Sequence, residues 1–415
     1  MDRTVYTADH EDFRDTCATF LAKKVAPHIE QYIEDKALPR DFWLAAGELG
    51  LLGLEIPEEF GGAGAEDFRF NAVWAEELSK VSAALASCVG IHSDITAPYI
   101  VELGTQEQKE RWLPKIASGE CLLAIGMTEP GGGSDLAALK TTAVRDGDEW
   151  VINGSKTFIT NGYSADLVVT AVRTSPEKGA KGITLFAIEA GDEGFSRGRK
   201  LDKVGQTESD TAELFFENVR VGDDRIIGEL DRGFIHMMQK LPQERLSCAI
   251  SNIAHAKQIL VETIQYAKDR KAFGQAIGNF QWNKFLIAEL VTKIEVAEAY
   301  LDNAVAAHAE KKFSAVDAAK AKWYTSDVQN QVLDHCGPDP RRLRLHERVP
   351  RGPRLARRPR DPHLGRLQRD HEGAHRPRPR PLSAVPPPSS ARHPAGARAP
   401  HLHDAARPHH RKAAP

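Results

Sequence analysis

Residues 150–162 read WVINGSKTFITNG, and this stretch decides the fold class. Two Asn-Gly pairs, at 153–154 and 161–162, flank a short alternating run, a pattern typical of β-hairpins because both residue types tolerate positive φ. We therefore expect a turn at each pair and an antiparallel β domain over residues 121–230. The same region contains three further predicted strands: DLVVTAVR (166–173), GITLFAIEA (182–190) and TAELFFENVRV (211–221).

The sequence on either side has the three- and four-residue apolar spacing of amphipathic helices. Thr105 and Gln108 form a capping-box pattern, and PEEFGGAG at 57–64 predicts a loop. The order helix, strand, helix indicates an α+β fold. The expected helices are 12–32, 41–54, 70–94, 106–117, 233–270, 279–312 and 315–336.

Composition excludes several protein classes. The 415 residues are 27% charged and 41% hydrophobic, and no run of eighteen apolar residues occurs, so no membrane span is expected. Five widely spaced cysteines form no CxxC pair, which argues against disulfide frameworks and metal sites and favours a reducing compartment. The polar, acidic N-terminus lacks the pattern of a signal peptide, and we expect a cytoplasmic protein.

Charge is distributed unevenly along the chain. Residues 337–415 hold 19 Lys+Arg against 6 Asp+Glu, whereas residues 1–336 hold 36 against 52. The C-terminal stretch also carries 16 of the 24 prolines and no Ile, Phe, Tyr, Trp or Met. Such a composition cannot bury enough apolar surface to offset its ordering entropy, so it predicts a disordered tail.

A shifted reading frame explains this tail better than a functional arm. Residues 337–350 read GPDPRRLRLHERVP. This run can be spelled in codons that encode VQIHGGYGYMNEYP once a single guanine after the Cys336 codon is removed. Continuing to Pro377 in the same frame permits VARAWRDARVTRIWGGSNEIMKELIGR. Long amphipathic sequence rarely arises in this way, so we interpret the tail as out of frame and the C-terminal helical domain as incomplete.

Residues 126–135, GMTEPGGGSD, contain three consecutive glycines. Such a loop can approach a ligand closely and offer backbone N–H donors, although three glycines taken alone are more often a plain connector. It matches neither the P-loop nor the GxGxxG pattern, so neither ATP nor a Rossmann-bound nicotinamide cofactor is predicted.

Longer motifs make the chain resemble the acyl-CoA dehydrogenase family over about residues 5–336. The motifs, in the family's order, are GMTEPGGGSDLAA (126–138), KTFITNG (156–162) and RKAFG (270–274) followed by Gln281. The resemblance implies FAD as cofactor, an acyl-CoA substrate, an electron-transfer flavoprotein as electron acceptor, and a homotetramer or homodimer. No nucleic-acid partner and no metal are implied.

The fold class that follows is α+β with an antiparallel β-barrel in the middle. The expected domains are a helical N-terminal domain at 1–120, the β-barrel at 121–230, a truncated helical bundle at 231–336 and the tail at 337–415.

By resemblance, Thr128 donates to the flavin ring, Phe158 lies against its face and Thr160 lies near N5. Arg270 and Gln281 contact the FAD of the neighbouring subunit, since a guanidinium pairs well with phosphate oxygens. Ordinary hairpin packing and a cation at a helix end are the alternatives for these residues. The full predicted cofactor set is Ile125, Gly126, Met127, Thr128, Glu129, Pro130, Gly131, Gly132, Gly133, Ser134, Phe158, Ile159, Thr160, Arg270 and Gln281.

The resemblance also assigns the catalytic base. The long-chain and isovaleryl branches of the family carry it at the position of Glu244, in LPQERL. Other branches carry the base in a C-terminal loop. With the reading frame restored, the codon at that loop position has the form GNC, which cannot encode Glu. A base needs a pKa raised by burial toward about 6–7. The residues predicted to border acyl-CoA are Ser134, Ala180, Lys181, Pro242, Gln243, Glu244 and Arg245.

Three alternatives stay open from the sequence. An acyl-CoA oxidase would pass its electrons to O₂, although the short chain argues against it. The out-of-frame tail could leave an inactive product. A basic tail is also typical of nucleic-acid binding, which would depend on salt.

Overall fold

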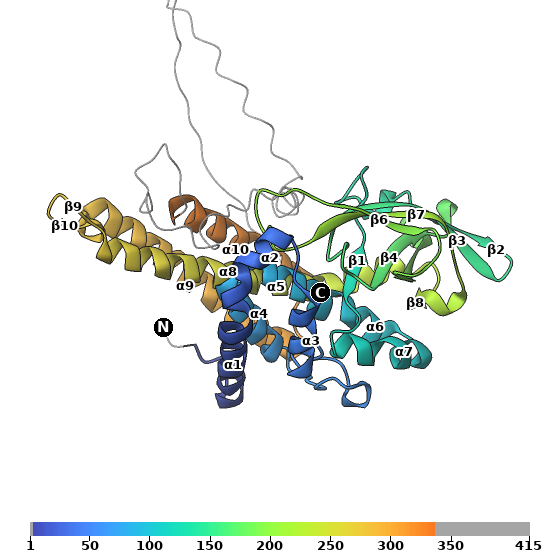
Figure 1. The fold of residues 1–415 in the computed structure, drawn as a ribbon, viewed down its shortest axis with the longest axis horizontal. Helices are drawn as coiled ribbons and strands as arrows, with labels where there is room; N and C mark the ends of the chain where they lie inside the picture. The colour runs from blue at the N-terminus through green and yellow to red at the C-terminus, as the bar shows by residue number, and fades with distance from the viewer. Residues whose placement is uncertain (1–2, 337–415) are drawn as a thin grey trace, which may run out of the picture. The chain divides into compact units, whose positions relative to one another are not determined.

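The computed structural model describes residues 3–336, and Figure 1 shows their helices and strands. The predicted disordered tail, the frame shift and the basic arm all fall outside the described residues. Across residues 3–336, no helix combines the length and apolar character needed to cross a membrane.

Helices form the N-terminal part of the chain, as predicted. The segment expected as one helix at 70–94 is divided, because Ser82 adopts extended backbone angles (φ −162°) and its hydroxyl accepts a hydrogen bond from the Ala84 N–H (3.0 Å). Serine favours such N-cap positions over helix interiors. The α-helices are α1 (Ala8–Phe20), α2 (Ile29–Asp35), α3 (Arg40–Glu48), α4 (Arg69–Val81), α5 (Ala83–Gly90), α6 (Ala97–Leu103) and α7 (Gln106–Ala117).

The predicted capping box at α7 is confirmed. The Thr105 hydroxyl accepts from the Gln108 N–H (3.3 Å), and the Gln108 side chain accepts from the Thr105 N–H (2.9 Å). Between α5 and α6 the chain forms a π-helical segment, Ile91–Thr96. Such segments are uncommon and often accompany functional sites, because they rotate the side chains that follow them.

The middle of the chain forms one eight-stranded sheet, and the prediction of an antiparallel β-barrel is wrong. The order is β6–β7–β3–β2–β4–β5–β8, with β1 added beside β4, so among residues 3–336 the sheet is open and mixed. Both β1 and β2 pair with β4 in parallel. The strands are β1 (Leu123–Gly126), β2 (Thr142–Asp146), β3 (Glu149–Thr160), β4 (Leu167–Arg173), β5 (Ile183–Glu189), β6 (Phe195–Lys200), β7 (Thr211–Val221) and β8 (Ile226–Ile227).

The two Asn-Gly pairs have different structures. Asn161 has φ +61° and ends β3 in a turn, as predicted. The turn predicted at Asn153-Gly154 is wrong, because β3 continues through it with a shift in its register against β7. Gly154 has φ +147°, and a Cβ there would lie 2.6 Å from the Thr141 hydroxyl. Glycine is therefore required at an irregularity within the strand, and not at a hairpin turn.

Strands β4 and β5 are buried on both faces over nearly their whole length. One face packs with α6 and α7 through a cluster that includes Tyr99, Leu113 and Val169. The other face packs against β3 and β7 through residues such as Val168 and Phe216. Alternation in the sequence predicted strands correctly, but it could not distinguish an open sheet covered by helices from a closed barrel.

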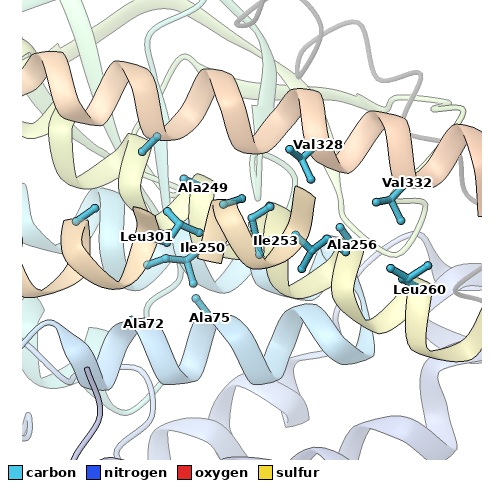
Figure 2. Close-up of a cluster of buried hydrophobic side chains, with 14 of the residues drawn as sticks. Ala72, Ala75, Ala249, Ile250, Ile253, Ala256, Leu260, Leu301, Val328 and Val332 are labelled. Atoms are coloured by element: carbon cyan, nitrogen blue, oxygen red, sulfur yellow. The ribbon is translucent and has the colours of Figure 1, made fainter. Parts of the chain in front are cut away.

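Three long helices follow the sheet: α8 (Gly233–Asp269), α9 (Gln281–Ala309) and α10 (Ala315–Cys336). They pack with α4 around one core, and Figure 2 shows Ile250 of α8 on the side of Ala75 of α4, with Val328 and Val332 of α10 on the opposite side. Small side chains there let the helix axes approach closely. A short hairpin, β9 (Lys271–Ala272) and β10 (Gln275–Ala276), joins α8 to α9. The labelled core residues are Ala72, Ala75, Ala249, Ile250, Ile253, Ala256, Leu260, Leu301, Val328 and Val332.

Candidate active site

Glu244 lies in the first third of α8, on a turn facing α6. The buried Tyr99 hydroxyl donates a hydrogen bond to Glu244 Oε1, at 3.1 Å. Burial raises the pKa of Glu244 to about 7, although the bond from Tyr99 and the charges of Lys322, Arg245 and Lys240 act against this rise. A carboxyl group with a pKa near neutrality can both accept and release a proton at physiological pH.

Asp94 holds the π-helical segment against α8. Its carboxylate accepts hydrogen bonds from Asn71 (2.9 Å) and from Ser247 (2.5 Å), which lies one turn after Glu244. The Gln243 side chain donates to the Asp94 carbonyl at 3.0 Å. These contacts fix the segment carrying Tyr99 relative to the helix carrying Glu244.

Sequence reasoning missed two further acidic groups, Glu55 and Asp94, which both contact Gln243 next to the base. Burial raises the pKa of Glu55 to about 8 and that of Asp94 to about 6. The Gln243 amide lies 3.3 Å from a Glu55 carboxyl oxygen, and its own oxygen is 3.1 Å from His308 Nε2. The only local signal was a lone acidic residue in an apolar run, LLGLEIP for Glu55.

The glycine-rich stretch begins as strand β1 and continues as an open loop. Glu129 and Gly132 exchange backbone hydrogen bonds of 3.0 and 3.1 Å, which form a tight turn. Residues 130–134 are exposed, and a Cβ added at Gly131 or Gly132 would meet no atom within 4 Å. The backbone of the loop is therefore accessible to a ligand.

The Glu129 side chain is buried beside β3. It forms an ion pair with the fully buried Lys156 (2.8 Å) and accepts from the Thr141 hydroxyl (2.7 Å) and the Lys140 N–H (2.6 Å). Burial opposes ionisation of Glu129, but Lys156 and Thr141 outweigh it and lower its pKa. Glu129 anchors the loop to β3.

The two predicted flavin segments lie side by side. The Thr157 N–H donates to the Thr128 carbonyl at 2.9 Å, which joins residues 125–134 to β3. Phe158 has φ +61° and its side chain is 36% exposed, whereas Ile159 is buried. The irregular register between Lys156 and Ile159 turns the aromatic ring outward. A bulky residue in the left-handed region is strained, and such strain is often found at functional sites.

The remaining predicted residues lie in three places. Pro242, Gln243 and Arg245 flank Glu244 on α8, which continues through Pro242 without ending. Ala180 and Lys181 lie in a 3₁₀ turn before β5, where Lys181 is exposed. The structure thus brings the α8 residues together but leaves this turn as a separate element.

Arg270 and Gln281 are exposed at the far end of the long helices. Arg270 caps the C-terminus of α8, where its N–H donates to the Tyr266 carbonyl at 2.9 Å. The 26 residues from Glu244 to Arg270 correspond to about 39 Å along an α-helix. Within one chain, Arg270 cannot reach a ligand that contacts Glu244.

Family models match nearly the whole described chain. The acyl-CoA dehydrogenase N-terminal domain matches residues 7–120, the middle domain matches 124–219 and the C-terminal domain matches 231–337. The chain belongs to the acyl-CoA dehydrogenase family. The C-terminal match ends one residue after Cys336, where the composition changes.

Individual relatives agree with this assignment. The chain is 41% identical over 340 residues to the long-chain specific acyl-CoA dehydrogenase, mitochondrial, of Mus musculus, covering 80% of this chain and 78% of that protein. It is 36% identical over 293 residues to the isovaleryl-CoA dehydrogenase of Solanum tuberosum, covering 70% and 71%. The solved acyl-CoA dehydrogenase of Geobacillus kaustophilus has a TM-score of 0.79 at 42% identity, covering 81% and 88%.

The cofactor of acyl-CoA dehydrogenases is FAD, and the donor set of this chain fits a flavin. Thr128 and Thr160 are partly exposed hydroxyl residues on the two joined segments, and Phe158 offers an aromatic face beside them. The open loop adds backbone N–H groups. Flavin rings are planar and carry several acceptors, so an aromatic surface edged with donors suits them.

Proposed function

We propose that this acyl-CoA dehydrogenase oxidises an acyl-CoA thioester to the trans-2-enoyl-CoA, with Glu244 as the base. The observation that carries this proposal is the half-buried Glu244 carboxyl, which accepts a hydrogen bond from Tyr99 and has a pKa raised to about 7. An unperturbed glutamate has a pKa near 4.3 and would be too weak a base for a proton next to a thioester.

In the proposed mechanism, ionised Glu244 takes the proton from the acyl α-carbon. FAD, when bound, would supply the two-electron acceptor for the hydride that leaves the β-carbon. The two broken C–H bonds thus leave one new C=C bond. Gln243 and Arg245 flank the base and, with Pro242, Ser134, Ala180 and Lys181, border the acyl-CoA. Lys240 lies one helical turn before Glu244 and forms an ion pair with Glu102 of α6.

The FAD would be held by two groups of residues. Residues 125–134 supply backbone and hydroxyl donors. Among them, Glu129 contributes by its ion pair with Lys156, which fixes the position of the loop. Phe158, Ile159 and Thr160 carry the ring contact. The second group, Arg270 and Gln281, holds the FAD of the partner subunit in a homotetramer or homodimer. Their distance from Glu244 along α8 supports this division.

The other parts of the proposal follow the family resemblance. The electron acceptor of the enzyme would be an electron-transfer flavoprotein. We place the domain boundaries at 1–120, 121–230 and 231–336, close to the ranges of the three family models. Five free cysteines, four of them buried, support a reducing compartment, for which we propose the cytoplasm.

The test is the change of Glu244 to Gln in FAD-loaded protein. Glu244→Gln should retain FAD and bind acyl-CoA, but its flavin absorbance should not bleach when substrate is added anaerobically, because the α-proton has no acceptor. General-base contributions of this kind are about 10²–10⁴-fold in rate. The control is Glu229→Gln, a glutamate whose side chain is 69% exposed just before α8. Normal bleaching in Glu244→Gln would refute the assignment of the base.

A further inference from the structure

A single hydrogen bond links α6 to the proposed base across 145 residues of sequence. The Tyr99 hydroxyl donates to Glu244 Oε1 at 3.1 Å, and Tyr99 is 0% exposed. Its ring belongs to the apolar cluster that joins α6 and α7 to the sheet, with Ile100 and Leu113 as neighbours. A phenol so enclosed has little freedom to turn away from its acceptor.

The segment that carries Tyr99 is itself held against α8. Asp94 of the π-helical segment accepts from Ser247, and Gln243 donates to the Asp94 carbonyl, so contacts exist on both sides of Glu244. Lys240 and Glu102 form an ion pair at the end of α6. The position of the phenol relative to the carboxyl is therefore set by three contacts to α8, two from the π-helical segment and one from α6.

Charged groups approach Glu244. Lys322 on α10 does so from another element, whereas Arg245 and Lys240 lie on α8 itself, and each favours the ionised carboxylate. Tyr99 differs from them because it forms a directed bond to one oxygen. Burial and the nearby Glu244 carboxylate raise the pKa of Tyr99 well above its usual value, so the phenol keeps its proton and remains a donor.

We propose that Tyr99 is a positioning residue for the reaction: its hydroxyl holds Oε1 of Glu244, orients the carboxylate and favours its ionised, proton-accepting form. This inference rests on the proposed function of Glu244. The bond is strongest to the carboxylate and weaker to the neutral acid. Tyr99 therefore stabilises the ionised Glu244 that accepts the proton, and it stabilises the protonated Glu244 formed by the reaction less.

The sign of the effect follows from that preference. A donor to the charged form lowers the pKa of a carboxyl group, so its removal raises the pKa of Glu244. Activity requires the ionised base, and the acidic limb of kcat/KM reports its pKa in the free enzyme. Tyr99→Phe should therefore move this limb to higher pH by about one unit, given the strength of hydrogen bonds to charged groups.

The experiment measures anaerobic flavin reduction by an acyl-CoA thioester against pH in full-length, FAD-loaded protein. Below the limb, Tyr99→Phe should be about tenfold slower, and well above it the rate should return close to wild type. The matched control is Tyr6→Phe, which removes another buried tyrosine–glutamate bond (Tyr6 to Glu76, 2.9 Å) on other elements. In Tyr6→Phe, the acidic limb of the pH dependence should stay where it is in the wild type.

A second variant tests the opposite direction with almost no change in shape. Site-specific 3-fluorotyrosine at position 99 makes the phenol a stronger donor and should move the limb to lower pH. It also serves if Tyr99→Phe fails to fold.

A second readout separates this inference from the proposed function. The infrared carboxyl band that disappears in Glu244→Gln gives the titration of Glu244 without any turnover. Suppose that the wild type reduces its flavin, but that neither the acidic limb nor the infrared band moves in the two Tyr99 variants. That result would overturn the role of Tyr99. A wild type whose flavin is not reduced, while the band still moves, would instead overturn the proposed function.

Discussion

Two glutamates of this protein, the buried Glu129 and the half-buried Glu244, have opposite electrostatic environments. Glu129 faces the ammonium group of Lys156 at 2.8 Å, and its pKa is lowered despite burial. Glu244 faces the neutral phenol of Tyr99 at 3.1 Å, and burial raises its pKa to about 7. The distances are similar, so the difference comes from the ammonium group and the bonds from Thr141 and Lys140 at Glu129, set against the neutral phenol at Glu244. A buried carboxylate beside a cation becomes a structural anchor, and one beside a phenol remains able to exchange protons.

The Glu129–Lys156 pair gives the largest expected effect. Glu129→Gln leaves the fully buried Lys156 without its counter-ion, and breaking a buried pair from one side costs about 3–5 kcal/mol. Denaturant unfolding should show this loss in the free energy of unfolding. Glu129→Gln combined with Lys156→Met should recover much of it, because no unpaired charge remains. A single variant losing less than about 1 kcal/mol would break the comparison.

The same change at Glu244 should affect stability in the opposite sense. The folded-state pKa of about 7 exceeds the ordinary value of 4.5, so the folded protein binds more protons between these pH values. Wild-type stability therefore falls as pH rises through this window, by up to about 1.4 kcal/mol per pH unit from this one group. Glu244→Gln should remove that slope, which urea unfolding at several pH values can measure. An unchanged slope would mean that Glu244 titrates normally.

An exposed charge gives the smallest expected effect on stability and sharpens the contrast with both buried sites. Arg270→Ala should change the free energy of unfolding by no more than about 0.5 kcal/mol, as is usual for surface substitutions. It should nevertheless lower the ratio of flavin to protein, because the proposed contact to the FAD pyrophosphate of the partner subunit is lost. Absorbance after gel filtration gives this ratio. A fully loaded Arg270→Ala oligomer would contradict the contact.

Local sequence signals predicted most of the helices and strands. The capping box at Thr105 and Gln108 marked the start of α7, and apolar spacing marked α8 almost to the residue. The errors arose where a local pattern has two solutions. Asn153-Gly154 has turn composition, yet the close approach of Thr141 makes it a strand irregularity. Likewise, strand alternation does not encode whether a sheet closes.

The candidate site was predictable only where a family motif covered it. The sequence identified Glu244 and the 125–134 loop, but it gave no sign that Tyr99 meets Glu244, since the two residues lie 145 positions apart. Glu129 was predicted to bind the cofactor, and its contact with Lys156 shows that it also anchors the loop. Glu55 and Asp94 were not singled out because acidic residues are usually solvated, and only packing shows that Glu55 is half-buried and Asp94 buried.

The unbroken length of α8 has a consequence for how the family's chemistry can vary. Helix α8 carries the base near one end and, in our proposal, the residue that holds a partner's cofactor at the other end, about 39 Å away. Inserting a single residue between them would turn the far end by about 100° and advance it by about 1.5 Å. Substitutions along the helix can be tolerated one at a time, whereas a change in its length would misalign two catalytic centres at once. The number of residues between Glu244 and Arg270 is therefore more constrained than their identity.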